Sequence, residues 1–176
     1  MARKKSPNEL RAGPAEAGSS RRVPMREFSR SLPMSLLRAR EAVMRQFRPS
    51  LREHGLTEQQ WRILRALATI EAAEVTELAR TAFLLGPSLS RILRDLEARN
   101  LIERKTAKAD QRRSMVSISK EGVKLMASVA PSSEAIYAEI TQRFGIRKLA
   151  ELQEMLGQLE VCLASTEARD EITDDA

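Results

Sequence analysis

The chain has 176 residues, 42% of them hydrophobic, which is enough for one folded domain with a hydrophobic core. No apolar run approaches the roughly 18 residues of a membrane span, and the first residues lack the apolar stretch of a secretory signal, so we expect a cytoplasmic protein without a membrane partner. One Cys and one His exclude a disulfide framework and a Cys/His zinc site within one chain, and we expect no metal or other cofactor.

The formal net charge of +6 is unevenly distributed. Residues 1–30 contain eight Lys and Arg against three Asp and Glu, and residues 80–113 contain nine against four. Residues 114–176 contain six against eleven. A basic middle and an acidic end favour a face presented to a polyanion such as nucleic acid, but a charged stretch alone is also compatible with a plain solvated surface.

A disordered basic arm and a long helix are predicted first. Residues 1–30 are rich in Arg, Lys, Ser, Gly, Pro and Ala and have no hydrophobic periodicity. A helix is expected from Leu32 to about His54, with Pro33 near its start and Pro49 bending or interrupting it late. Arg40 lies within the apolar stripe of this helix, although it is a permanent cation. The stripe consists of Leu36, Leu37, Val43, Met44 and Phe47.

Three shorter helices follow. In "LTEQQWRILRALATI", Thr57 and Gln60 form a capping box, and the buried stripe is expected to be Trp61, Leu64, Leu67 and Ala68. The segment "EVTELARTAF" predicts a short helix capped at Thr76. A fourth helix, in "LLGPSLSRILRDLEARN", is expected to begin at Pro87 and to stop at Asn100 in a left-handed conformation. Its buried residues should be Leu89, Ile92, Leu93 and Leu96.

Two short strands, "LIERKT" and "SMVSIS", flank the polar segment "AKADQRR", which we expect to be a loop too long for a two-residue turn. A helix is then expected from Ser119 to about Phe144, with Pro131 inside it, and another from Ile146 to about Leu163. Residues 166–176 should form an acidic, frayed tail. The pattern predicts a mainly α fold with a small β-wing, a winged helix-turn-helix.

The outer face of the fourth helix and the segment between the strands are the candidate DNA contacts. Arginine can bind guanine through two parallel hydrogen bonds, and serine can contact bases or phosphates. A plain solvated helix surface is the alternative, which the preceding helix pair and the following basic ribbon disfavour. We expect Asp110 to pair with an arginine and orient it, and Arg112 to suit a narrow minor groove. The candidates are Ser88, Ser90, Arg91, Arg94, Lys108, Asp110, Arg112 and Arg113, and Asp95 lies on the same outer face of the fourth helix.

Residues 75–122, "VTELARTAFLLGPSLSRILRDLEARNLIERKTAKADQRRSMVSISKEG", resemble the MarR family of regulators. The spacing Asp110-x-Arg112 followed by "VSISKEG" is similar to the family's wing, and the resemblance covers about residues 32–163. Within the family, "LLRAREAVMRQFRPSLREHGLTEQQWRILRAL" resembles the branch that represses homoprotocatechuate (4-hydroxyphenylacetate) degradation operons. The chain departs from this pattern in its longer basic N-terminal arm and in Asn100, where glycine is common.

The resemblance implies a homodimer on a pseudo-palindromic operator of double-stranded DNA, with two recognition helices in successive major grooves. Residues 31–56 and 119–165 would form the dimerisation helices, and residues 57–118 the DNA-binding lobe. Two apolar sets are consistent with this dimer, although each could equally serve a core within one chain. They are Val123, Met126, Val129, Ile136 and Ile140, and Leu149, Leu152, Leu156 and Leu159.

The resemblance also implies a small aromatic carboxylate effector, similar to hydroxyphenylacetate, that binds where the dimerisation helices meet the DNA-binding lobe and releases the operator. A carboxylate in an apolar crevice needs a cation, and Arg40 fits that role. Alternatively, Arg40 forms an internal salt bridge, for instance with Glu41, or extends past the stripe to solvent. Secondary candidates are Ser35, Arg38, His54, Trp61 and Arg62, of which Trp61 could instead be core and His54 an ordinary histidine.

The function expected is therefore transcriptional regulation, most simply repression of an aromatic-acid catabolic operon. An enzyme is disfavoured because the sequence has no Gly-rich phosphate loop, nucleophile motif or metal cluster. Three other regulators remain as alternatives: one of the same family with a different effector, a redox-responsive one and a sequence-neutral DNA-binding protein. A redox sensor would depend on Cys162, which is predicted on an apolar terminal helix.

Overall fold

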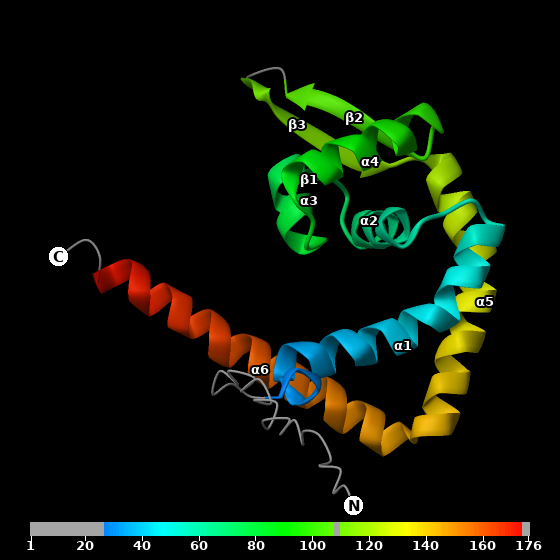
Figure 1. Ribbon diagram of the computed structural model, residues 1–176. Helices are drawn as coiled ribbons and strands as arrows, with labels where there is room; N and C mark the ends of the chain where they lie inside the picture. Colours follow the sequence, from blue (N-terminus) through cyan, green and yellow to red (C-terminus); the bar gives the residue numbers. More distant parts are fainter. Residues whose placement is uncertain (1–26, 108–109, 174–176) are drawn as a thin grey trace, which may run out of the picture. The chain divides into compact units, whose positions relative to one another are not determined.

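The computed structural model describes residues 27–107 and 110–173. Figure 1 shows the helices α2, α3 and α4 gathered beside a small sheet, and α5 following strand β3. This confirms a mainly α fold with a small antiparallel sheet. The elements are η1 (Phe28–Arg30), α1 (Leu32–Glu53), α2 (Glu58–Ala68), β1 (Ala73–Glu74), α3 (Val75–Thr81), α4 (Gly86–Ala98), β2 (Ile102–Ala107), β3 (Asp110–Ile118), α5 (Lys120–Phe144) and α6 (Ile146–Thr173).

The chain divides into two units, residues 1–39 and residues 40–176, and helix α1 belongs to both. Residues 28–30, which the sequence assigns to the disordered arm of residues 1–30, instead form the 3-10 turn η1, so this part of the prediction is wrong. The rest of the predicted arm, up to residue 26, lies outside the described residues. Helix α1 continues through Pro49 to Glu53, so the proline does not interrupt it.

Helix α2 begins with the predicted capping box. Thr57 Oγ1 accepts a hydrogen bond from the backbone N–H of Gln60 at 3.2 Å, and Gln60 Oε1 accepts one from the backbone N–H of Thr57 at 2.8 Å. Two backbone donors that the first turn leaves without helical partners are thereby satisfied. The helix that carries much of the candidate site therefore has a fixed start.

Helix α3 begins at Val75, so the predicted cap at Thr76 is wrong. Glu74 occupies the cap position with extended backbone and makes no capping side-chain hydrogen bond, because it belongs to strand β1 and pairs with Met115. A strand of two residues is too short to show alternation, which is why the sequence did not reveal it. Helix α4 agrees with expectation: Pro87 lies in its first turn, and Asn100 follows it with φ of 55°.

The sheet is antiparallel with the order β1-β3-β2. Strand β2 pairs with β3 from Ile102 opposite Ile118 to Ala107 opposite Asp110, with an irregularity between Thr106 and Ala107. The loop predicted over residues 107–113 is therefore wrong, since β3 begins at Asp110 and only residues 108–109 separate the strands. Backbone pairing does not depend on side-chain polarity, so a polar segment can extend a ribbon.

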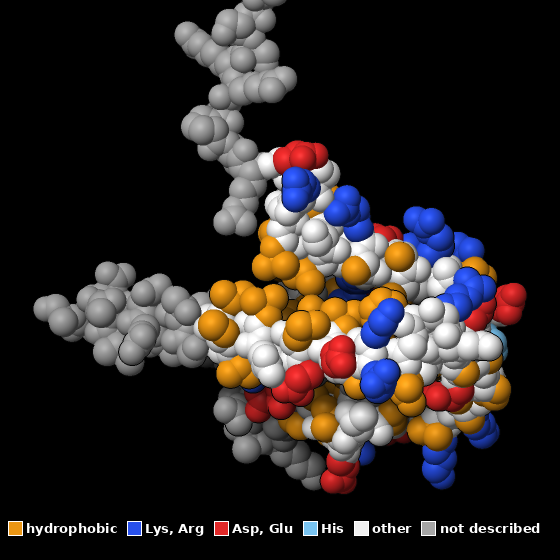
Figure 2. Space-filling view, turned by 90° about the horizontal axis from the view of Figure 1, so that it is seen from below, with side chains coloured by type: hydrophobic (Ala, Val, Ile, Leu, Met, Phe, Trp, Pro, Cys, Tyr) orange, Lys and Arg blue, Asp and Glu red, His pale blue; other side chains and the backbone are white. Residues whose placement is uncertain are grey.

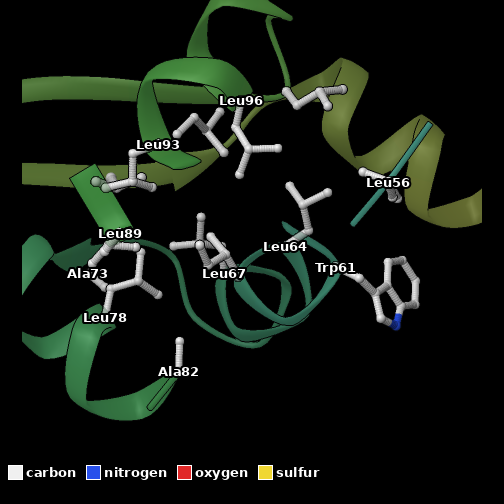
Figure 3. Close-up of a cluster of buried hydrophobic side chains, with 14 of the residues drawn as sticks. Leu56, Trp61, Leu64, Leu67, Ala73, Leu78, Ala82, Leu89, Leu93 and Leu96 are labelled. Atoms are coloured by element: carbon white, nitrogen blue, oxygen red, sulfur yellow. The ribbon is translucent and has the colours of Figure 1, made fainter. Parts of the chain in front are cut away.

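The core lies between α2, α3, α4 and the sheet. Figure 3 shows Leu64 and Leu67 of α2 near Leu93 and Leu96 of α4, with Trp61 at the edge of the same cluster. Leu89 is also buried, as predicted, whereas Ile92 is only partly buried. Ala68 is exposed, contrary to expectation, and Ile63 is buried in its place. Ala68 lies two turns after Trp61 on the same face of α2, at the margin of the core. The indole of Trp61 is large enough to reach neighbouring side chains from this face, whereas the methyl group of Ala68 is not.

Ser119, where this helix was expected to begin, is the N-terminal cap of α5, and its hydroxyl accepts a hydrogen bond from the N–H of Gly122 at 2.9 Å. Helix α6 extends from Ile146 to Thr173, well beyond the predicted end near Leu163, so the backbone of the expected tail is helical up to Thr173. Glutamate and alanine in this segment are good helix formers. None of the described helices is long and apolar enough to cross a membrane.

Candidate functional site

A pocket of about 490 Å³ opens between α1, α2, the turn after α3, and α5. This volume is in the usual range for small-molecule sites, roughly 300 to 1,000 Å³. The rings of Phe47 and Tyr137 form part of the wall, with centroids 4.9 Å apart and planes inclined at 60°. The full lining is Arg40, Val43, Met44, Phe47, Glu58, Trp61, Arg62, Arg65, Phe83 and Tyr137.

Arg40 lines this pocket, as its place in the apolar stripe predicts. Its Nη1 also donates a hydrogen bond to Glu41 Oε1 at 2.9 Å, and its Nη2 forms an ion pair with Glu58. The alternative interpretation of Arg40, an internal salt bridge, is therefore confirmed. A carboxylate entering the pocket would have to compete with two acidic side chains for this guanidinium.

The side chain of Glu58 is only 13% exposed and receives three arginines: Arg40, Arg48 at 3.2 Å and Arg62 at 3.0 Å. Arg48 also bonds to Glu41, at 2.8 and 2.9 Å. The hydrogen bond from Arg48, together with the charges of Arg48, Arg40 and Arg45, holds the pKa of Glu41 below its ordinary value. The carboxylates of Glu41 and Glu58 thus offset the positive charges of the α1 arginines with which they pair.

Arg62 and Arg65, one turn of α2 apart, have different partners. Arg62 donates to Glu58 through Nη2 and to the backbone carbonyl of Ala82 through Nη1, the latter at 2.9 Å. Arg65 Nη1 donates to the hydroxyl of Tyr137 at 3.1 Å and pairs with no acidic side chain in the described part of the chain. Arg65 is therefore the lining cation that a ligand carboxylate can reach without displacing an ion pair.

The outer face of α4 is exposed at every residue of this helix predicted to contact DNA, namely Ser88, Ser90, Arg91 and Arg94, and also at Asp95. Arg94 Nε lies 3.4 Å from the carbonyl of Ser90, and Arg91 has no hydrogen bond or ion pair with any described residue. Asp95 instead accepts a hydrogen bond from the buried Gln60 at 2.5 Å and lies 3.7 Å from Arg99 Nη1. Asp95 thus attaches α4 to α2, which leaves the arginines for an outside partner.

Residues 54–113 match the MarR family. The homoprotocatechuate degradative operon repressor of Escherichia coli is 40% identical over 126 residues, which cover 72% of this chain and 85% of that protein. The chain belongs to the MarR family. Its curated relatives are transcriptional regulators, and this MarR-family protein is a transcriptional regulator, not an enzyme. The resemblance to the homoprotocatechuate repressors noted in residues 36–67 is thereby confirmed.

Two solved structures are similar to this chain over more than three quarters of its length. NadR in complex with 4-hydroxyphenylacetate is 36% identical, with a TM-score of 0.67 over 78% of this chain and 97% of that chain. CouR bound to a 23-mer DNA duplex is 25% identical, with a TM-score of 0.70 over 78% of this chain and 98% of that chain. The winged helix-turn-helix fold predicted for this MarR-family protein is therefore established.

The wing candidates of the MarR-family protein remain predictions. The backbones of Asp110, Arg112 and Arg113 lie in β3, but their side chains are outside the description, and Lys108 is not described at all. The proposed pairing of Asp110 with an arginine is not tested by the structure. The position of the ribbon after α4 is nevertheless the one that a DNA-binding wing requires.

The secondary pocket candidates divide into two groups. Trp61 and Arg62 line the pocket. Ser35 and Arg38 belong to the unit of residues 1–39, where they donate to the carbonyls of Ser31 at 3.2 Å and Ser29 at 2.7 Å. His54 does not line the pocket; its Nδ1 lies 2.9 Å from the carbonyl of Ser50. Cys162, on which a redox sensor would depend, is exposed on α6 and lies outside the lining.

Several functional candidates were missed from the sequence. Arg65 lies four residues after Trp61, and this helical spacing could have placed it beside the pocket. Glu58 was not among the sequence candidates, although it lies in the first turn of the same helix. Phe83 and Tyr137 come from the turn after α3 and from α5, which no local pattern brings together with α2.

Proposed function

We propose that this MarR-family regulator is a homodimeric repressor of an aromatic-acid catabolic operon, and that a small aromatic carboxylate in the pocket releases it from a palindromic operator. The observation that carries the proposal is an aromatic pocket in which one of three lining arginines, Arg65, has only the neutral hydroxyl of Tyr137 as a partner in the described structure. The likeness to a homoprotocatechuate repressor and to NadR with 4-hydroxyphenylacetate supports this class of effector.

The ligand's ring would lie among Met44, Phe47 and Trp61, and its carboxylate would bind Arg65 and Tyr137. A buried carboxylate is costly without a cation, and a charge-assisted bond to arginine offsets that cost. Arg40, the first candidate from the sequence, becomes a secondary anchor because Glu41 and Glu58 already pair with it.

Replacing Arg65 by glutamine should weaken 4-hydroxyphenylacetate binding by about 10-fold to 100-fold, since a hydrogen bond to a charged group contributes about 1.5 to 3 kcal/mol. Operator affinity without ligand should not change. Titration calorimetry measures the first quantity and a mobility shift the second. The matched control is Arg52→Gln, at an exposed arginine of α1 outside the pocket. If Arg40→Gln abolished ligand binding while Arg65→Gln preserved it, the carboxylate would belong at Arg40 instead.

In the DNA complex, α4 would be the recognition helix in the major groove, and the ribbon of β2 and β3 would approach the adjacent minor groove with Arg112. Two protomers would place their α4 helices about 10 base pairs apart, so the operator should be palindromic. Support comes from the exposed Arg91 and Arg94 and from the likeness to CouR on its duplex. Affinity should fall steeply with salt, because bound phosphates release counterions.

The partner that we propose for α6 is a second copy of the chain. No side chain of α6 between residues 146 and 164 is buried, and Met155 and Val161 are 58% and 70% exposed. Figure 2 shows hydrophobic side chains spread over one face of the molecule. An exposed apolar helix of this length is unusual for a monomer and is typical of an interface between copies.

Replacing Leu156 by glutamate should convert the dimer into a monomer at micromolar concentration, because the substitution introduces a charge into the apolar face of α6. Sedimentation velocity measures the change in mass. The control Gln158→Glu adds the same charge to an exposed polar position of the same helix and should leave the mass unchanged. A Leu156→Glu protein that remained dimeric would remove α6 from the interface.

A further inference from the structure

We propose that Arg62 is the positioning residue through which the occupied pocket acts on the recognition helix α4. The inference rests on the proposed function, because it takes the pocket as the effector site and α4 as the DNA-reading helix. It adds the route by which the occupied pocket affects α4. This route consists of the guanidinium of Arg62, the C-terminal end of α3 and the short turn that leads to α4.

The guanidinium of Arg62 belongs to the pocket and to the helix-turn-helix at once. It lines the pocket, and its Nη2 holds Glu58, another lining residue, at 3.0 Å. Its Nη1 donates to the carbonyl of Ala82 at 2.9 Å. Ala82 is the C-terminal cap of α3 and is fully buried. A carbonyl at this position has no partner within its own helix, so the arginine satisfies it.

The turn after Ala82 leads directly into α4. Phe83 has φ of 50°, and the N–H groups of Phe83 and Leu84 donate back to Arg80 and Ala79, which closes the end of α3. Leu85 is already the N-terminal cap of α4. Only three residues therefore separate the carbonyl held by Arg62 from the first residue of the recognition helix. A shift of that carbonyl moves the start of α4.

The same turn also forms part of the pocket wall. The side chain of Phe83 lines the pocket and is 80% exposed in a left-handed conformation that phenylalanine rarely adopts. Such a conformation costs of order 1 kcal/mol and points to a functional role. A ligand that packs against Phe83, or whose polar groups reach the Glu58–Arg62 pair, therefore contacts a group that fixes the turn.

The proposed switch has two states. In the empty pocket, Arg62 bridges Glu58 and Ala82 and sets the position of α4 relative to α2. In the occupied pocket, the ligand draws Arg62 and Phe83 into a different arrangement, and α4 loses its DNA-binding position. The coupling arises because the ligand binds the second arrangement more tightly than the first. A purely structural role of Arg62 would lower stability and leave the coupling intact.

The decisive variant is Arg62→Lys, because lysine keeps the charge beside Glu58 but has one nitrogen in place of the two guanidinium nitrogens that separately reach Glu58 and the carbonyl of Ala82. The measured quantity is the ratio of operator Kd values with and without saturating 4-hydroxyphenylacetate. For wild type we expect a ratio in the usual range for allosteric proteins, about 5 to 150. For Arg62→Lys the ratio should fall to about 2 or less, because the bridge through which the pocket acts on α4 is lost.

Two further variants complete the experiment. Arg52→Lys, a matched change outside the network, should keep the wild-type ratio. Phe83→Gly relieves the left-handed backbone, so it should fold even if Arg62→Lys does not, and it should also lower the ratio. A folded Arg62→Lys protein with the wild-type ratio would overturn the inference and leave the proposed function standing. A wild-type protein whose operator affinity did not respond to 4-hydroxyphenylacetate would contradict both.

Discussion

Replacing Arg91 and Arg94 together by alanine should weaken binding to the specific operator by about a hundredfold or more. Each arginine that binds a guanine through two hydrogen bonds contributes about 1 to 3 kcal/mol of discrimination, and about 1.4 kcal/mol corresponds to a factor of ten. Both residues are exposed on α4, and Arg91 has no competing partner among the described residues. Fluorescence anisotropy at fixed salt, with an operator obtained by selection from random duplexes, measures the loss.

The informative control is the double variant Arg91→Lys with Arg94→Lys. Lysine preserves the positive charge but not the planar fork that recognises guanine, so non-specific binding and its salt dependence should persist. The ratio of specific to non-specific affinity should fall in both double variants. If this ratio were unchanged after both arginines became alanine, α4 could not be the helix that reads bases.

Replacing Gly122 by alanine should lower the free energy of unfolding by about 3 kcal/mol, at the upper end of the range for overpacked sites. Gly122 is buried in the first turn of α5, where an added Cβ would collide with the backbone carbonyl oxygen of Leu101 and lie 2.8 Å from Ile118 Cγ1. The backbone oxygen cannot move without disturbing the start of β2, so the collision cannot be relieved cheaply. Urea unfolding followed by circular dichroism measures the change.

The matched control for Gly122→Ala is Gly86→Ala. Nothing lies within 4 Å of a Cβ built at Gly86, the first residue of α4. Alanine there should leave stability unchanged or raise it by up to about 1 kcal/mol, because glycine loses more conformational freedom on folding. Equal unfolding free energies for the two alanine variants would contradict the prediction. They would mean that α5 moves away from the start of β2 and relieves the collision at little cost.

The order of the elements could be predicted from the sequence because it depends on local rules. The capping box at Thr57 and Gln60, Pro87 in the first turn of α4, and Asn100 after it all involve residues close together in the chain. Strand β1 could not be predicted, because Ala73 and Glu74 are extended only through pairing with β3, about forty residues later. The length of the β2–β3 ribbon was underestimated for a related reason. Its polar residues pair through backbone hydrogen bonds, which do not depend on the side chains.

The site was predictable only in part. The exposed face of α4 and the cation within the apolar stripe of α1 follow from helical periodicity, and the structure places Arg40, Trp61 and Arg62 in one pocket. Periodicity could not reveal which arginine is already paired. That depends on Glu58 of α2 meeting Arg40 and Arg48 of α1, and on Tyr137 of α5 meeting Arg65. These are tertiary contacts.

Strand β1 has a consequence for how the DNA-binding lobe loses its structure. Its two residues pair with Val116 and Met115 of β3 and are followed without a linker by α3. The ribbon and α3 are thus joined through the backbone hydrogen bonds between β1 and β3. The base of the ribbon and α3 should therefore open together, with similar protection of their amide hydrogens against exchange, as a single cooperative unit.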